Sequence, residues 1–356
     1  MNGLMEPLAP FSTRLIAWQM QHGRHHLPWQ GTRDPYRVWL SEIMLQQTQV
    51  TAVVGYFDRF IRRFSDVHEL ARASQDEVLA LWSGLGYYSR ARNLHRCANI
   101  VCSEHAGIFP RTAQLLETLP GVGSSTAAAI ASICFDERIS IFDGNVQRVL
   151  SRYVGFESDL ATAAARNALL AVAAKCLPAL ADACHMPTYT QALMDLGATL
   201  CTPRSPSCSR CPVSADCVAF ARNTQLQLPV KTRKLRRQTK RLWWLVLRTQ
   251  AGQVWLTKRP VSGVWASMYC FPEFESEVDA RSALSSSIST HVTVLNAFKH
   301  VLTHLDLVIH PLLLDSFNPS LLELTDTGGW FAYPGHTADI GLPKPVSWLL
   351  EQMESL

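Results

Sequence analysis

The sequence has no apolar run of the eighteen or so residues that a membrane-spanning helix needs. The Ala-rich region 160–183 predicts soluble helices, because basic residues, a proline and an aspartate interrupt it. The first thirty residues also lack the apolar core of a signal peptide, since Arg14, Arg24 and three histidines lie within them. These absences argue against a membrane or secreted protein, and we expect a cytoplasmic chain.

Acidic residues are missing from the stretch Pro229–Arg241, which carries seven lysines and arginines. The net charge of the whole chain is only +4, so the remainder is slightly acidic. With 356 residues, 47% of them hydrophobic and 17% charged, the chain is long enough for two globular domains. We expect domains at 1–228 and 242–356, joined by a basic linker at 229–241 that is either simply solvated or also follows a phosphate backbone.

The ten cysteines do not have the distribution of a secreted disulfide framework, because six are scattered singly among apolar segments. The other four form the cluster Cys201-x6-Cys208-x2-Cys211-x5-Cys217. Four thiolates in so short a segment can enclose either zinc or an iron-sulfur cubane. Zinc sites usually pair two Cys-x2-Cys knuckles, and this segment has only one. The pattern indicates a reducing compartment and one metal site.

The stretch 119–143 combines a candidate phosphate site with a carboxylate. Gly121 and Gly123 flank a valine and predict a tight hairpin, and the small residues that follow predict a closely packed helix. The backbone N–H groups of such a hairpin can bind an anion, with phosphate as the obvious candidate. An apolar run then delivers Asp143 to the start of another helix, with Asn145 beside it. Alone, the glycines could be a plain helix entry and Asp143 a plain N-cap.

A second carboxylate, Glu42, lies inside the apolar pattern of a helix expected over 38–50. Desolvation there would raise its pKa and leave it as a proton donor, whereas a solvent-facing glutamate is the alternative. Gln46, Gln47 and Gln49 follow at the end of this helix. Their amides are suited to reading base edges or to occupying the place of an extruded base.

An exposed aromatic residue is predicted after the turn formed by Gly84 and Gly86. Tyr87 and Tyr88 are poor candidates for both being buried, and Arg90 follows them closely. An exposed tyrosine beside arginine can insert into a base stack, an interaction worth about 1–3 kcal/mol per stacked base.

Together these motifs resemble the helix-hairpin-helix DNA glycosylases and, within them, the adenine DNA glycosylases of the MutY type. The resemblance covers nearly the whole chain and implies a mainly α glycosylase domain with an iron-sulfur loop at 201–217, followed by an α+β Nudix-like domain. It assigns a 4Fe-4S cluster, with a positional or redox-sensing role, to the four clustered cysteines. It implies that Glu42 and Asp143 are catalytic and that DNA is contacted by Gln46, Gln47, Tyr87, Gly121, Gly123, Ser125, Asn145, Thr303 and His304.

The β-rich region that begins near Leu242 carries the Nudix-like part of the resemblance. Nudix hydrolases use an Arg-Glu-x-x-Glu-Glu set, and residues 279–284 occupy its place without that set. We therefore expect a domain that recognises the lesion without metal-dependent hydrolysis. The family probes the damaged base with Phe-Ser-His, where this chain has Leu302-Thr303-His304. The hydroxyl and the imidazole remain, but the aromatic ring is lost.

The implied activity is excision of adenine mispaired with 8-oxoguanine or guanine in double-stranded DNA, by a monomer that is nucleoid-associated if the organism is bacterial. Glu42 would protonate the purine, and ionised Asp143 would stabilise the cationic sugar. Bifunctional relatives carry a lysine nucleophile at the position of Ser125, and no lysine lies between Leu119 and Asp143. A monofunctional enzyme that leaves an abasic site is therefore expected. The alternatives are a glycosylase or lyase for oxidised pyrimidines and a catalytically silent iron-sulfur sensor of DNA.

Overall fold

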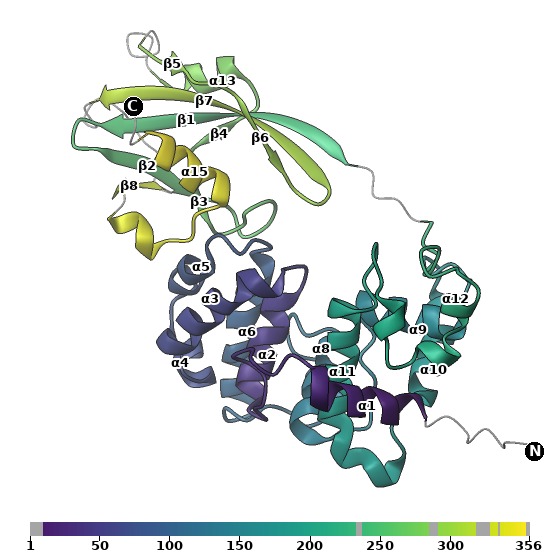
Figure 1. Ribbon diagram of the computed structural model, residues 1–356. Coiled ribbons are helices and arrows are strands. Elements are labelled where there is room, and N and C mark those ends of the chain that lie inside the picture. Colours follow the sequence, from purple (N-terminus) through teal and green to yellow (C-terminus); the bar gives the residue numbers. More distant parts are fainter. Residues whose placement is uncertain (1–9, 233–236, 285–290, 318–327, 334, 354–356) are drawn as a thin grey trace, which may run out of the picture. The chain divides into compact units, whose positions relative to one another are not determined.

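The computed structural model describes residues 10–232, 237–284, 291–317, 328–333 and 335–353. The chain divides into two compact units (Figure 1). One comprises Met1–His68 and Arg96–Arg233, and the other comprises Glu69–His95 and Lys234–Leu356. Residues 69–95 therefore belong to the same compact unit as the C-terminal region. Domain boundaries that divide the sequence into contiguous segments cannot express this grouping.

The first unit is helical (Figure 1). Its helices are α1 (Phe11–His22), α2 (Pro35–Leu45), α3 (Val50–Arg63), α7 (Ala113–Leu116), α8 (Ser124–Phe135), α9 (Gly144–Val154), α10 (Ala163–Lys175), α11 (Met186–Thr199) and α12 (Val218–Ala221), with 3-10 turns η1 (Leu180–His185), η2 (Cys208–Arg210) and η3 (Ser214–Asp216). Helices α4 (Val67–Arg72) and α6 (Ser89–Glu104) each cross from one unit to the other along the chain. No helix among the described residues is long and apolar enough to span a membrane.

Helix α2 begins at a clear N-capping sequence and ends earlier than its sequence pattern predicts. Asp34 is its N-cap, where the side chain accepts a hydrogen bond from the Tyr36 N–H, and Pro35 occupies the first turn. The predicted helix over 38–50 is wrong at its C-terminal end, because α2 stops at Leu45 and α3 begins at Val50. Gln47 has a φ of 57°, a left-handed conformation that an α-helix cannot contain. The glutamines therefore form a turn between two helices.

Helix α11 packs against α1, α8 and α9 and forms the centre of the first unit. Its buried face includes Tyr189, Leu193 and Leu196. At Gly197 the start of α9 comes very close, since a Cβ placed on this glycine would lie 3.0 Å from the Asn145 Cβ. A glycine at this point permits the approach that brings α9 onto α11.

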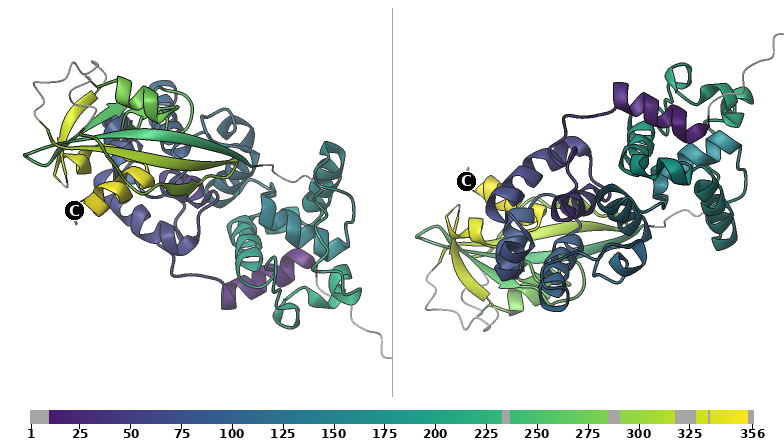
Figure 2. Two further views of the ribbon diagram at one scale, coloured as in Figure 1. Left: turned by 90° about the horizontal axis from the view of Figure 1, so that it is seen from above. Right: turned by 90° about the horizontal axis from the view of Figure 1, so that it is seen from below.

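In the part of the second unit that the structure describes, eight strands form a mixed sheet. Its order is β3-β2-β1-β7-β5, while β4 pairs with β1, β6 with β7 and β8 with β2. The strands are β1 (Gln238–Thr249), β2 (Gln253–Lys258), β3 (Tyr269–Cys270), β4 (Glu273–Phe274), β5 (Thr293–Val294), β6 (Phe298–Val301), β7 (Leu305–Phe317) and β8 (Gly328–Ala332), and the helices are α5 (Gln75–Trp82), α13 (Glu277–Ser282), η5 (His336–Asp339) and α15 (Lys344–Met353). The long strands β1 and β7 run in parallel side by side (Figure 2).

Strand β1 begins at Gln238, four residues before the predicted start of this region at Leu242. Its first four residues are exposed and polar, so the sequence resembles a linker there. From Leu242 onward most residues are buried, as expected for a central strand covered on both faces. Of the basic residues predicted to form the linker, Arg233, Lys234 and Arg236 lie outside the described residues.

Candidate active site

A cavity of about 480 Å³ lies in the first unit among α2, α11 and the chain between α1 and α2. Glu42 lines it from α2, near the apolar side chains of Val38, Leu45 and Ile133. Burial raises the pKa of the Glu42 carboxyl to about 8, and the negative charge of Asp143 contributes in the same direction. The sequence prediction of a desolvated, protonated glutamate agrees with this environment. At neutral pH Glu42 can donate a proton into the cavity.

Asp143 is the N-cap of α9, as one sequence interpretation proposed. Its carboxylate accepts hydrogen bonds from the backbone N–H groups of Asn145 at 3.0 Å and Val146 at 2.8 Å, and from the Asn145 side chain at 3.4 Å. These donors and the positive end of the helix dipole suit a negative charge. Capping and an electrostatic effect on Glu42 are therefore combined in one residue.

Ser125 holds the backbone immediately before Asp143. Its hydroxyl oxygen accepts a hydrogen bond from the Phe142 N–H at 3.1 Å, while the Gln147 side chain donates to the Phe142 carbonyl at 3.3 Å. The peptide groups around Phe142 are thus fixed from α8 and from α9. The sequence predicted Ser125 only as a DNA contact and missed this positioning contact.

The hairpin before α8 has the conformation that its glycines allow. Gly121 has a φ of 78°, where a side chain would be strained, and Gly123 is the N-cap of α8. Val122 between them is buried and anchors the turn, while both glycines are exposed. Open space surrounds the Cα of Gly123, so a phosphate can approach the backbone N–H groups at the start of α8.

The glutamine turn after α2 lies against α8. Gln46 donates from Nε2 to the Thr126 hydroxyl at 3.4 Å. Gln47 is exposed, and Gln49 is the N-cap of α3. The two predicted DNA-contacting glutamines therefore differ, because Gln46 is held by a protein partner and Gln47 faces solvent.

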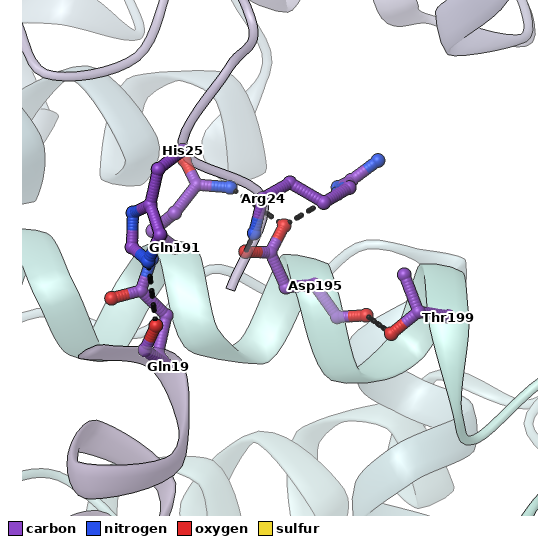
Figure 3. A network of polar contacts seen from close by, with 6 residues as sticks. All are labelled: Gln19, Arg24, His25, Gln191, Asp195 and Thr199. Atoms are coloured by element: carbon purple, nitrogen blue, oxygen red, sulfur yellow. Dashed lines mark hydrogen bonds and ion pairs between the residues drawn. The ribbon is translucent and has the colours of Figure 1, made fainter. Parts of the chain in front are cut away.

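A network of polar contacts connects Asp195 to neighbouring residues (Figure 3). Asp195 is fully buried and accepts hydrogen bonds from the Arg24 backbone N–H at 3.0 Å, from Arg24 Nε at 2.7 Å and from Gln191 Nε2 at 3.0 Å. Arg24 and Gln191 both line the cavity. The sequence interpretation of Asp195 as a helix cap is wrong, since it lies inside α11. Gln191 and Asp195 are four residues apart on one helix face, a signal that the sequence contains.

The second unit brings together two other predicted DNA contacts. Tyr87 has a φ of 50° and is 43% exposed, whereas Tyr88 is buried, as expected. The hydroxyl groups of Tyr87 and Thr303 share a hydrogen bond of 2.9 Å. Thr303 and His304 are exposed in the turn between β6 and β7.

The four clustered cysteines line one small cavity in the first unit. In a 4Fe-4S cubane four thiolates surround one space, and each binds a separate iron atom. The four cysteines around this cavity are therefore a donor set that fits such a cluster.

Helix α9 connects this loop to Asp143. Arg148 donates from Nε to the Cys201 carbonyl at 2.8 Å, and from Nη2 to Asn145 Oδ1 at 3.0 Å and to the Gly197 carbonyl at 2.8 Å. Asn145 in turn donates to Asp143. A continuous series of hydrogen bonds therefore runs from the first cluster cysteine to the carboxylate at the helix N-terminus.

The helical unit and its hairpin define a class of base excision repair proteins. A family described as "HhH-GPD superfamily base excision DNA repair protein" matches residues 40–194, "Iron-sulfur binding domain of endonuclease III" matches 201–217, and "NUDIX domain" matches 243–352. These matches confirm the predicted fold class: a helix-hairpin-helix glycosylase domain with an iron-sulfur loop, followed by a Nudix-like domain. They also confirm the expectation of a 4Fe-4S cluster.

Comparison with similar proteins shows which family within this class the chain resembles. The adenine DNA glycosylase of Buchnera aphidicola subsp. Schizaphis graminum is 35% identical over 345 residues, which are 96% of this chain and 98% of the relative. The adenine DNA glycosylase of Mus musculus is 44% identical over 227 residues, 61% of this chain and 43% of the relative. The chain belongs to the adenine DNA glycosylase family.

Solved structures share the helical fold. A thermostable thymine-DNA glycosylase has a TM-score of 0.52 and 27% identity, covering 60% of this chain and 95% of that chain. Endonuclease III in a non-covalent DNA complex has a TM-score of 0.50 and 21% identity, covering 62% of this chain and all of that chain (100%), and it shows the fold alone.

Proposed function

We propose that this DNA glycosylase hydrolyses the N-glycosidic bond of adenine mispaired with 8-oxoguanine or guanine and leaves an abasic site. One observation carries the proposal: Glu42, with a pKa of about 8, lines a cavity and interacts electrostatically with Asp143. The cavity volume of about 480 Å³ lies within the range of small-ligand pockets, so an extruded purine has room.

The two carboxyl groups have complementary roles. Protonated Glu42 donates its proton to a ring nitrogen of the extruded adenine, which makes the base a better leaving group. As the glycosidic bond breaks, both of its electrons go to the base and the sugar becomes cationic. Ionised Asp143 stabilises that sugar, and Glu42, now deprotonated, accepts a proton from the attacking water. The opposed protonation states follow the logic of glycoside hydrolysis.

Strand cleavage is not part of this proposal. Ser125 occupies the position of the lysine nucleophile of bifunctional relatives, and the described cavity lining contains no lysine. Ser125 already accepts a hydrogen bond from the Phe142 N–H. Without an amine, no Schiff base forms with the sugar, and hydrolysis leaves the strand intact.

Duplex DNA is bound, in this proposal, by a monomer whose domains are 1–228 and 242–356. The hairpin glycines bind a phosphate, Gln46, Gln47 and Asn145 contact the site of extrusion, and Tyr87 inserts into the base stack. Thr303 and His304 contact the base opposite adenine. The cluster cysteines Cys201, Cys208, Cys211 and Cys217 hold the 4Fe-4S cluster, which shapes the loop and does not enter the hydrolysis.

The test uses duplexes with adenine opposite 8-oxoguanine, guanine or thymine, and one with cytosine opposite 8-oxoguanine. Alkali after the reaction reveals abasic sites, and a parallel sample without alkali reveals direct strand cleavage. We expect alkali-dependent breaks at adenine opposite 8-oxoguanine and guanine only. Breaks without alkali, with covalent trapping by borohydride that depends on residues 119–143, would contradict monofunctional chemistry.

A further inference from the structure

Arg152 is a buried cation at the cluster cavity. It belongs to α9, is only 3% exposed and lines the same cavity as the four cysteines. Buried arginines are normally paired with a carboxylate, because an isolated charge is costly to remove from water. The groups that neutralise the charge of Arg152 therefore indicate what this residue does.

The described hydrogen bonds of the Arg152 guanidinium go to carbonyl oxygens and to one sulfur. Nε donates to the Leu228 carbonyl at 3.1 Å, Nη1 to the Thr202 carbonyl at 2.8 Å and Nη2 to the Pro203 carbonyl at 3.1 Å. Nη1 also donates to Cys201 Sγ at 3.4 Å. Carbonyl groups satisfy the N–H donors but supply no full negative charge. The only partner here that can be anionic is a cluster cysteine.

The main chain of Arg152 is near a second ligand sulfur. Cys217 Sγ lies 3.4 Å from the Arg152 carbonyl oxygen, a contact in which the thiol donates. When Cys217 binds iron as a thiolate, it has no proton to donate, so this contact adds no stabilisation. The guanidinium contact to Cys201 is different, because a thiolate is a better acceptor than a thiol.

We propose that Arg152 is the internal counter-charge of the 4Fe-4S cluster and makes the cluster harder to oxidise. Four thiolates give the bound cluster a net negative charge, and the cluster becomes less negative when it loses an electron. A fixed cation that donates to a ligand sulfur favours the electron-rich form, since hydrogen bonds to the sulfurs and local charge set the reduction potential. Arg152 is a positioning residue for the cofactor, with no contact to the substrate.

The test compares Arg152→Gln with Arg152→Lys. The first substitution removes the positive charge, and the second keeps the charge but loses the planar guanidinium group with its several N–H donors. The double variant Arg14→Met with Asp216→Asn is the matched control, because this ion pair of 2.7 Å also holds the cluster loop and its removal leaves the net charge unchanged. Anaerobic holoenzyme is titrated with ferricyanide, which takes one electron from the cluster and becomes ferrocyanide. The spectrum of the oxidised cluster is followed by electron paramagnetic resonance and normalised to bound iron.

In Arg152→Gln we expect the oxidation equilibrium to shift toward the oxidised form by about tenfold, the factor for a lost hydrogen bond to a charged group. Arg152→Lys should shift it less, and the double variant of Arg14 and Asp216 should match the wild type. If Arg152→Gln holds no iron while Arg152→Lys loads fully, the charge requirement is supported. Equal titration curves for Arg152→Gln and the wild type, or equal loss of iron in both Arg152 variants, would overturn the proposal.

Discussion

The hydroxyl groups of Tyr87 and Thr303 lie 2.9 Å apart and share a hydrogen bond within the second unit. Tyr87 is the proposed wedge and Thr303 belongs to the proposed probe of the opposite base. The Arg90 Cζ lies 5.4 Å from the centroid of the Tyr87 ring, and Arg90 is itself buried. The guanidinium group therefore packs against the Tyr87 ring and restricts its position. The wedge and the probe are therefore parts of one hydrogen-bonded structure before DNA binds.

Tyr87→Phe should keep the ring and lose the link to Thr303. A lost neutral hydrogen bond costs about 0.5–1.5 kcal/mol, so we expect a two- to tenfold smaller preference for adenine opposite 8-oxoguanine over guanine. The measurement is the ratio of single-turnover rates on the two duplexes. Thr303→Val should reproduce the effect, and the double variant should add nothing. Additive losses would show that the two hydroxyl groups act separately.

Ser125→Ala should weaken catalysis by releasing the backbone before Asp143. The substitution leaves the half-buried Phe142 N–H without its partner, at a cost of about 1 kcal/mol, the low end of the range for a buried group. We expect a lower single-turnover rate with little change in DNA affinity, measured by gel shift on a non-cleavable duplex. The neighbouring Ser124→Ala is the control, since Ser124 is exposed. A loss of affinity at unchanged rate would instead support the original prediction of a DNA contact.

Asp195→Asn should destabilise the cavity wall. The substitution leaves the Arg24 guanidinium beside a neutral amide, and breaking a buried ion pair costs about 3–5 kcal/mol. Because the Arg24 side chain is 21% exposed, we expect the low end of this range. The free energy of unfolding, measured with denaturant, should fall by about 3 kcal/mol. Thr199→Ala is the control, because its hydroxyl donates to the main-chain carbonyl of Asp195 and not to the carboxylate. Equal stability of the two variants would contradict this account of the network.

The pH dependence of adenine release follows from the pKa of Glu42. The active form is the protonated one, so the single-turnover rate should be constant below pH about 8 and fall about tenfold per pH unit above it. The rate falls as the pH rises because burial stabilises the neutral carboxyl, and deprotonation above the pKa removes the proton donor. Rates measured between pH 6 and 10 at fixed ionic strength test this. A rate that rises through pH 8 would mean that Glu42 acts first as a base.

The surroundings of the two carboxylates could be predicted from the sequence for physical reasons, while their catalytic roles stay predictions. Glu42 is the one carboxylate of α2 and has mostly apolar neighbours, and Asp143 lies between an apolar run and a helix start. Both signals are local, and so is the spacing of the cluster cysteines. A resemblance to a family then supplied the roles that the residues alone left open.

What the sequence did not predict depends on contacts between distant parts of the chain. Arg24 and Asp195 are separated by 171 residues, and nothing local marks them as partners. The turn at Gln47 was missed because glutamine is a good helix former and signals no break. The early start of β1 was missed because its first residues are solvated and resemble a linker. The grouping of residues 69–95 with the C-terminal sheet is likewise a tertiary property.

The central claim is that Glu42 and Asp143 act together on one extruded adenine. The most direct measurement is free adenine released in a single turnover from a duplex with adenine opposite 8-oxoguanine, by the wild type, Glu42→Gln, Asp143→Asn and the double variant. We predict that each single variant loses at least about a hundredfold in rate, the contribution of a positioned acid or base, and that the double variant is little worse than either. Adenine release at the wild-type rate by the double variant would contradict the account.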